Sequence, residues 1–83
     1  MAESVDFSGL VRTLVEPLIE DVEQLSIEES VDDQGNALVE IRVADDDAGK
    51  VIGRQGRVIK AIRTVVRAAG SRAGQSVDVE LVD

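Results

Sequence analysis

The chain has 83 residues, 43% of them hydrophobic, which is the length and composition of one small globular domain. It contains no cysteine and no histidine, which excludes disulfides, zinc–thiolate sites, thiol nucleophiles and the commonest general base. No apolar run approaches the ~18 residues of a membrane span and the N-terminus lacks a signal pattern, so we expect a soluble intracellular protein without membrane contact.

The charges are distributed unevenly along the chain. The net charge of −8 by itself argues against a nucleic-acid partner. Between Ala48 and Val77, however, there is no acidic residue. The basic residues of that stretch are Lys50, Arg54, Arg57, Lys60, Arg63, Arg67 and Arg72. This pattern predicts a positive face that steers a polyanion to one site, or else a basic helix that balances acidic neighbours within the fold.

The first predicted element is an amphipathic helix over about residues 6–19. Its apolar residues recur at spacings of three and four and are Phe7, Leu10, Val11, Leu14, Leu18 and Ile19. Asp6 or Ser4 is placed to cap its N-terminus. Because Pro17 removes a helical hydrogen bond and clashes with the preceding turn, we expect a kink or break near Val15.

Two strands are predicted next, because the apolar period changes to two over residues 24–31 and again over residues 37–43. Turn-forming Asp, Gly and Asn residues occupy 32–36 between them, so we expect an antiparallel hairpin. The apolar residues expected on one face of the first strand are Leu25, Ile27 and Val31.

Three aspartates, Asp45 to Asp47, follow the second strand. A calcium loop that began at Asp45 would need glutamate at its twelfth position, where Gly56 stands, so no metal site is expected. We interpret the aspartates as an N-cap with favourable negative charge at the start of a short helix over residues 48–52.

A longer helix is predicted over about residues 57–69, with Gly70 as its C-cap, and a third strand over residues 77–81. The basic stripe opposite the apolar face of this helix comprises Arg57, Lys60, Arg63 and Arg67. The predicted order is helix, strand, strand, helix, helix, strand. Three strands whose one apolar face is covered by helices form a two-layer α+β domain.

The segment Gly53-Arg54-Gln55-Gly56, here called the GxxG loop, lies between the two later helices and carries the functional signal. Its glycines let the backbone approach a ligand closely, and free amides at the start of the next helix favour an anion such as a phosphate. Arg54 and Arg57 add positive charge. No residue there can act as a nucleophile or a base, so the sequence predicts phosphate binding without catalysis and without a cofactor.

Other glycine-rich phosphate motifs fit this segment badly. A P-loop needs glycine at the position of Ala44 and serine or threonine at that of Val51. A dinucleotide fingerprint also needs glycine in place of Val51, in a parallel βαβ setting. The predicted strands have no aromatic residue to stack bases as an RRM sheet does.

The pattern Val51-Ile52-Gly53-x-x-Gly56-x-x-Ile59, with a basic residue in the loop, resembles the signature of the KH RNA-binding domain. The order of elements is similar to the type II, prokaryotic KH fold (α-β-β-α-α-β with a mixed sheet), which implies a single KH domain over residues 1–83 with its core at about 7–82. At this length the chain also resembles the KhpA family of small bacterial single-KH proteins. Further segments that carry this likeness are Pro17-Leu18-Ile19, Gly49-Lys50-Val51-Ile52-Gly53 and Ala61-Ile62-Arg63-Thr64.

The resemblance implies a cytoplasmic protein that binds single-stranded RNA, acts as an RNA chaperone with a KhpB-like KH partner, and influences cell elongation or cell-wall growth. In KH domains the GxxG loop grips the backbone of about four nucleotides. Carried onto this sequence, the RNA-binding residues are Gly53, Arg54, Gln55 and Gly56 as the clamp, with Lys50, Arg57, Lys60 and Arg63 beside it.

Several residues near the loop have two interpretations. Val51, Ile52 and Ile59 belong either to an apolar groove that receives bases or to the core, and we favour the core for Ile52 and Ile59. Arg63 and Arg67 either contact phosphates further along the strand or only solvate the helix.

The alternative function is a protein-interaction module with an auxiliary KH fold, whose main role is dimerisation or partner docking. A three-stranded sheet leaves at least one edge open, and like charges disfavour contact through the acidic body. We therefore expect a weak homodimer, formed through an apolar helix edge or the acid-free surface near the GxxG loop, that competes with the KH partner.

Overall fold

The computed structural model describes residues 5–82, whose helices and strands follow the predicted order. The elements are α1 (Phe7–Val15), β1 (Ser26–Val31), β2 (Ala37–Arg42), α2 (Asp45–Ile52), α3 (Arg57–Arg72) and β3 (Val77–Leu81). Short 3-10 turns occupy Glu16–Leu18, Val22–Gln24 and Arg54–Gly56. The predicted α+β architecture, with its α-β-β-α-α-β order, is confirmed.

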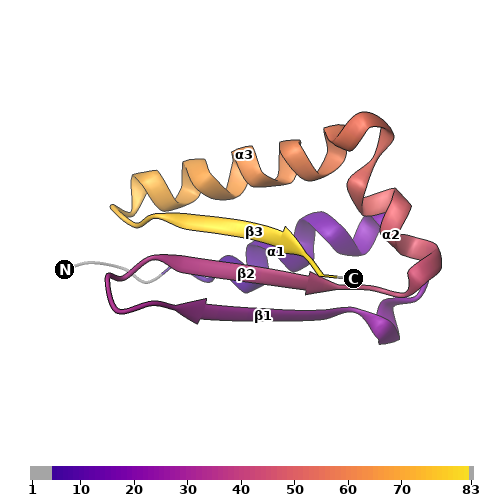
Figure 1. Cartoon of the computed structure of the whole chain (residues 1–83), viewed down its shortest axis with the longest axis horizontal. Coiled ribbons are helices and arrows are strands. Elements are labelled where there is room, and N and C mark those ends of the chain that lie inside the picture. Colours follow the sequence, from indigo (N-terminus) through magenta and orange to yellow (C-terminus); the bar gives the residue numbers. More distant parts are fainter. Residues whose placement is uncertain (1–4, 83) are drawn as a thin grey trace.

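The strands form a mixed sheet in the order β1-β2-β3. β1 pairs antiparallel with β2, and β2 pairs parallel with β3. The parallel pair is connected through α2 and α3, and α3 runs back against the direction of β3 (Figure 1). The GxxG loop at the start of α3 therefore lies beyond the C-terminal ends of the two parallel strands.

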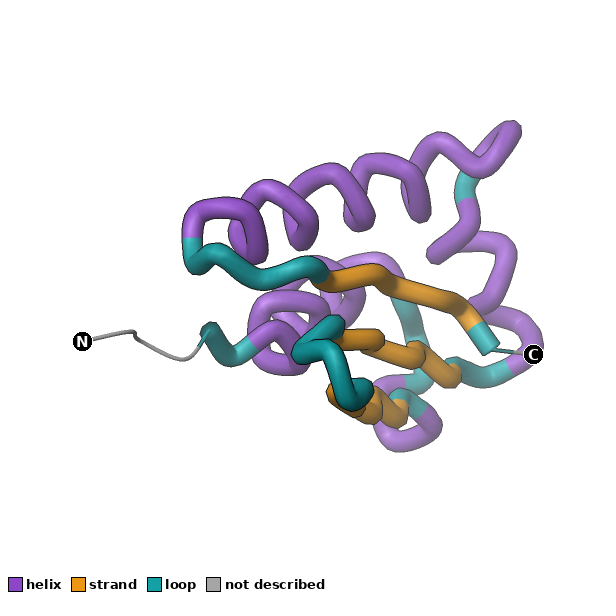
Figure 2. Tube along the Cα trace, turned by 60° about the vertical axis from the view of Figure 1, so that its left-hand side comes forward, coloured by secondary structure: helices purple, strands orange, loops and turns teal. Residues whose placement is uncertain are grey.

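The hydrophobic core lies between the sheet and the helices that cover one of its faces (Figure 2). Along β2 the burial alternates, with Ala37, Val39 and Ile41 buried and the residues between them more exposed. The other fully or nearly fully buried apolar residues are Phe7, Val11, Val15, Ile19, Leu25, Val51, Ile59, Ile62, Val66, Val77 and Val79. Within residues 5–82, no helix has the length and apolarity to cross a lipid bilayer.

α1 has the cap and the break that the sequence predicts. The Gly9 amide donates to the Asp6 carboxylate at 2.9 Å, so Asp6 is the N-cap, while Ser4 lies outside the described residues. The helix ends at Val15, two residues before Pro17, and the chain continues as a 3-10 turn. The predicted break near Val15 is confirmed.

β1 differs from the prediction at both ends. Residues 22–24 form a 3-10 turn, so the strand begins at Ser26. Leu25 and Ile27 pack against the core as predicted, but Val31 is 57% exposed. Val31 is the last residue of an outer strand, next to the hairpin turn, which explains why the alternating pattern does not bury it.

α2 begins three residues earlier than predicted. Its first residue is Asp45, its N-cap is Ala44, and no side chain caps it, so the interpretation of the aspartates as an N-cap is wrong. They lie in the first turn, where negative charge is favourable to the helix dipole. Asp47 is buried there.

α3 continues to Arg72, so the prediction of Gly70 as its C-cap is wrong. Gly70 is buried within the last turn, where a Cβ would lie 2.6 Å from the Gln75 carbonyl oxygen and 2.5 Å from Val77 Cγ1. A glycine at this position lets the helix end pack closely on the start of β3. The residue with positive φ after the helix is Gly74, at 71°.

Candidate nucleic-acid interface

The GxxG loop turns sharply between α2 and α3 through left-handed backbone. The φ angle is 76° at Gly53, 57° at Gln55 and 72° at Gly56. The Gly56 amide donates to the Gly53 carbonyl at 3.1 Å, and the Arg57 amide donates to the Arg54 carbonyl. The loop is therefore a compact turn with two i to i+3 hydrogen bonds and left-handed backbone, and it leads directly into the N-terminus of α3.

The two glycines of the loop are required for different physical reasons. A Cβ on Gly53 would overlap the Val58 side chain and lie 2.9 Å from the Val58 amide nitrogen, so Gly53 is needed to pack the loop on the first turn of α3. A Cβ on Gly56 would meet Lys60 Cε at 4.0 Å and no nearer atom. Gly56 therefore supplies left-handed backbone and leaves the space beside the helix N-terminus open.

The residues next to that open space include the exposed basic residues Arg54, Arg57 and Lys60. Arg57 donates from Nη2 to Oε1 of Gln55 at 3.0 Å, which ties the loop side chain to the start of α3. Within residues 5–82, neither Arg54 nor Lys60 has a carboxylate partner. The loop thus combines uncompensated positive charge with the amides of a helix N-terminus.

Lys50, predicted to flank the loop, pairs instead with the acidic residues beside α2. Its Nζ lies 3.1 Å from Glu20 Oε1 and 3.3 Å from Asp47 Oδ1. The hydrogen bond to Glu20 is the main reason why the pKa of Lys50 is raised above its ordinary value. Two carboxylates therefore compensate much of its charge, although the side chain remains 42% exposed.

Asp47 positions α2, a role that the sequence did not reveal. Its buried carboxylate accepts hydrogen bonds from the amides of Asp21 (3.0 Å) and Glu20 (3.1 Å), which hold its pKa below the ordinary value. These bonds tie α2 to the segment that follows α1. In the sequence Asp47 is indistinguishable from its exposed neighbours Asp45 and Asp46, because its partners are main-chain amides 26 and 27 residues away.

Arg63 and Arg67 extend from α3 to β3. Arg63 donates from Nε to the Val79 carbonyl at 2.9 Å, and Arg67 Nη2 lies 2.9 Å from Asp78 Oδ1. Burial raises the pKa of Asp78, but the Val79 amide and Arg67 lower it by more, so the net shift is downward. Both arginines therefore brace α3 against the edge strand. Arg67 balances an acidic neighbour within the fold, which was one of the two interpretations of the basic stretch, whereas the bond from Arg63 to a main-chain carbonyl was not expected.

The apolar residues beside the loop divide between core and surface. Val51 is fully buried and Ile59 is 8% exposed, so both belong to the core. Ile52 is 40% exposed, and the expectation that it lies in the core is wrong. The buried residues of α2 are Asp47 and Val51, four positions apart, and Ile52 lies outside that stripe. Ile52 therefore offers an apolar surface next to Gly53.

The opposite flank of α3 borders an apolar groove of about 290 Å³ between α1 and α3. Its lining residues are Leu14, Arg57, Val58, Ala61, Ile62 and Val65. Val65 is 46% exposed there, and Arg57 connects the end of the groove to the GxxG loop. α3 therefore has a basic flank facing β3 and an apolar flank facing α1.

The profile of the family described as "KhpA/KhpB, KH domain" matches residues 8–81. The chain is 38% identical over 73 residues to the RNA-binding protein KhpA of Clostridium acetobutylicum, an alignment that covers 88% of this chain and 96% of the relative. It is 40% identical over 74 residues to the RNA-binding protein KhpA of Bacillus subtilis, with 89% and 90% covered. The prediction of a binding protein rather than an enzyme agrees with these relatives, which are named as binding proteins.

Two solved structures of Era have a similar fold over 90% of this chain at 21% sequence identity. The TM-score is 0.60 to Aquifex aeolicus Era bound to GDP and AlF4⁻, and 0.61 to Era in complex with MgGDPNP and nucleotides of 16S ribosomal RNA. The chain spans 29% and 28% of those two chains, and at this identity the likeness shows the fold alone. With the family profile matching nearly all of the described residues and curated relatives 38–40% identical, the chain belongs to the KhpA/KhpB KH-domain family.

Proposed function

We propose that the chain, as a single KH domain, binds single-stranded RNA by clamping its backbone with the GxxG loop. The observation that carries this proposal is the left-handed turn at Gly56, which leaves open space at the start of a helix without acidic residues. A phosphate that enters this space meets the amides of the first turn of α3 and the charges of Arg54 and Lys60. The relatives, which are named RNA-binding proteins, support RNA as the polyanion.

The predicted site residues take different parts in this clamp. Gly53 and Gly56 shape the turn, Gln55 and Arg57 line it, and Arg54 supplies exposed charge. Lys60 lies one turn further along α3. Lys50 and Arg63 have a weaker part than the sequence suggested, because carboxylates hold the first and the Val79 carbonyl holds the second.

Replacing Arg54 and Gln55 together by aspartate tests the clamp. Both glycines remain, and aspartate tolerates left-handed backbone, so the turn is kept while negative charge stands where the phosphate binds. We expect roughly a tenfold or larger loss of affinity for a short oligoribonucleotide, measured by fluorescence anisotropy, with an unchanged circular dichroism spectrum.

The matched control replaces Gln34 and Arg42 by aspartate, which changes the net charge equally at exposed positions outside the acid-free stretch. Equal losses of affinity in the two variants would mean that net charge alone matters. An unchanged affinity of the loop variant would contradict the clamp.

We further propose that the chain acts in the cytoplasm as an RNA chaperone with a KhpB-like KH protein, and through it affects cell elongation or cell-wall growth. Membership of a family whose description names both proteins supports this pairing. The expected phenotype of a deletion strain is altered cell length, restored by the wild-type chain and not by the variant with aspartate at positions 54 and 55.

The apolar groove between α1 and α3 favours a second candidate function, in which docking of the KhpB-like partner is the main role. Val65→Asp places a charge in the groove, and Val22→Asp is a control at a similarly exposed valine elsewhere. If docking is the main role, Val65→Asp abolishes co-purification with the partner and Val22→Asp does not. The cell-length phenotype of each variant then matches its binding to the partner rather than its affinity for RNA.

We also expect the chain to form a weak homodimer that the partner displaces. A strict monomer in sedimentation at high micromolar concentration would contradict this.

A further inference from the structure

We propose that a second RNA subsite lies at the far end of α3, in a pocket of about 400 Å³ that accepts a base with its ribose rather than a phosphate. Its lining residues are Arg67, Ser71, Gly74, Gln75, Ser76 and Val77. This proposal rests on the proposed function, because it extends the same RNA strand beyond the GxxG loop.

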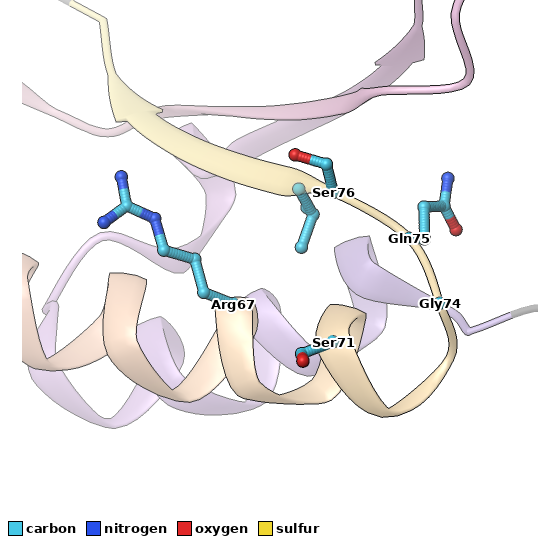
Figure 3. A pocket seen from close by; sticks show the side chains of 6 residues that line it. Arg67, Ser71, Gly74, Gln75 and Ser76 are labelled. Atoms are coloured by element: carbon cyan, nitrogen blue, oxygen red, sulfur yellow. The ribbon is translucent and has the colours of Figure 1, made fainter.

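The pocket lies between the last turns of α3 and the first residues of β3. Figure 3 shows Arg67 and Ser71 on the helix and Ser76 across from them at the start of the strand. The walls are held in place, because the Gln75 amide donates to the Gly70 carbonyl at 2.8 Å and Gln75 Nε2 donates to the Gly35 carbonyl at 3.3 Å. A ligand therefore meets a preformed site and does not have to order it.

The pocket lies on the same flank of α3 as the basic residues that face β3. Arg63, Arg67 and Ser71 are four residues apart, so they form one ridge along the helix. Arg63 and Arg67 both contact β3, which shows that this ridge borders the edge strand. From Gly56 to Ser71 the helix rises about 22 Å, so a single strand that leaves the loop along this ridge reaches the pocket.

The chemistry of the pocket suits a base and a ribose. The Asp78 carboxylate holds Arg67 at 2.9 Å, and the carbonyl end of α3 has negative partial charge, so both disfavour a phosphate. The hydroxyls of Ser71 and Ser76 can donate and accept hydrogen bonds, as the edges of bases and the ribose hydroxyls require. The guanidinium plane of Arg67 provides a surface on which a base can stack.

A length series of oligouridylates from four to ten nucleotides tests the subsite. We expect wild-type affinity to rise about five- to tenfold at the length that first spans loop and pocket, the effect of one or two net hydrogen bonds. Ser71→Leu fills the pocket, and leucine favours helix, so this variant keeps the fold and loses the gain while binding the shortest oligomer like wild type. Ser30→Leu, at an exposed serine of β1, is the matched control and keeps the gain.

The outcomes separate this proposal from the one on which it rests. If no oligomer binds, the proposed function fails; if short oligomers bind and length adds nothing, only the subsite fails. An equal loss for short and long oligomers in Ser71→Leu overturns the subsite, since it reveals an effect through the fold, and Ser76→Leu repeats the test from the strand side. Oligomers that lack the base at the 5′ or the 3′ terminal ribose show whether the pocket binds a base. If it does, removing the base at one of the two ends abolishes the gain in affinity with length. If the gain is unchanged for both ends, the pocket does not bind a base.

Discussion

Two regions of the molecule carry opposite charge in different arrangements. The GxxG loop together with α3 is basic, and the face of the sheet that no helix covers has a row of acidic residues. Around the loop the basic side chains are spread along a helix and share a stretch of 30 residues without an acid. On the uncovered face of the sheet, Glu28, Glu40 and Glu80 lie directly opposite one another on adjacent strands. We call these three residues the glutamate row. Like charges placed side by side across strands destabilise a sheet, so the row has an energetic cost.

This contrast explains how a chain with a net charge of −8 can present a site for a polyanion. The helices cover one face of the sheet and the glutamate row occupies the other, so these three negative charges lie on the side away from the helix layer. Such a field repels RNA from the sheet face and leaves the helix face as the approach. The separation of charges in space, rather than their sum, predicts the kind of partner.

The largest expected effect distinguishes the two glycines that shape the positive face. Gly53→Ala places a Cβ against Val58 at φ 76°, so we expect it to lower the free energy of unfolding by about 2–4 kcal/mol in urea titrations. Gly56→Ala strains the backbone but meets open space, so its cost is about 1–2 kcal/mol, while the new methyl group obstructs the phosphate. Equal stability of the two variants would contradict the separate roles assigned to the glycines.

The salt dependence of RNA affinity should come from the basic helix face and not from the glutamate row. If the helix face contacts about three to five phosphates of a single strand, log affinity falls against log salt with a slope of about −2 to −3.5. From 50 to 200 mM salt this is roughly a 15- to 130-fold loss of affinity. Replacing the glutamate row by glutamine should leave the slope unchanged, because those residues release no counterions on binding. A flat salt dependence of the wild type would favour the interaction module, since apolar docking is insensitive to salt.

Asp47 offers a test of the support under the positive face. Asp47→Asn weakens acceptance of the Glu20 and Asp21 amides, and we expect the Tm at pH 7 to fall by about 4–8 °C. The folded-state pKa of Asp47 lies below its ordinary value of 3.8, so its contribution is present above that pH and is lost as the pH falls through the lower, folded value. The difference in Tm between wild type and variant should therefore narrow below pH 4.

The control for this pH series is Asp46→Asn, an exposed aspartate in the same turn of α2. It should change the Tm little at any pH. If the difference between wild type and Asp47→Asn stays constant down to pH 2.5, the hydrogen bonds to the charged carboxylate are not the source of its stability.

Local patterns predicted the order of the elements, the break before Pro17 and the GxxG loop. Each of these depends on residues within a few positions of one another: a proline ring, an alternation of apolar residues, or glycines between two helices. The helix ends were harder to predict, because Gly70 looks like a C-cap in sequence but is required by close packing on Val77 and Gln75. That requirement comes from another element.

The parts of the site that the sequence missed depend on long-range contacts. Nothing near Asp47 indicates that amides 26 and 27 residues earlier donate hydrogen bonds to its carboxylate, and nothing near Arg63 indicates that the Val79 carbonyl accepts a hydrogen bond from its guanidinium. The exposure of Ile52 depends on which stripe of α2 faces the core, and the buried residues of that stripe are Asp47 and Val51. The burial of Asp47 by main-chain partners could not be read from the sequence, so neither could the orientation of the helix.

The smallest expected effect concerns the glutamate row itself. Glu40 is the central member, flanked by Glu28 on β1 and Glu80 on β3, so Glu40→Gln removes both like-charge contacts of the row at once. We expect it to raise the free energy of unfolding by about 0.5 kcal/mol at low salt, and by less in 0.5 M salt, where the Debye length is only a few ångströms. Glu23→Gln changes the net charge equally at an exposed position outside the sheet and should have a smaller effect on the free energy of unfolding.

RNA affinity should change by the same small factor in both variants, because each acts on the loop only through the long-range field. If Glu40→Gln instead destabilises the chain, Glu40 makes stabilising contacts that outweigh its repulsion from Glu28 and Glu80. The glutamate row would then stabilise the sheet, and its negative charge would not be an energetic cost that is offset by orienting RNA.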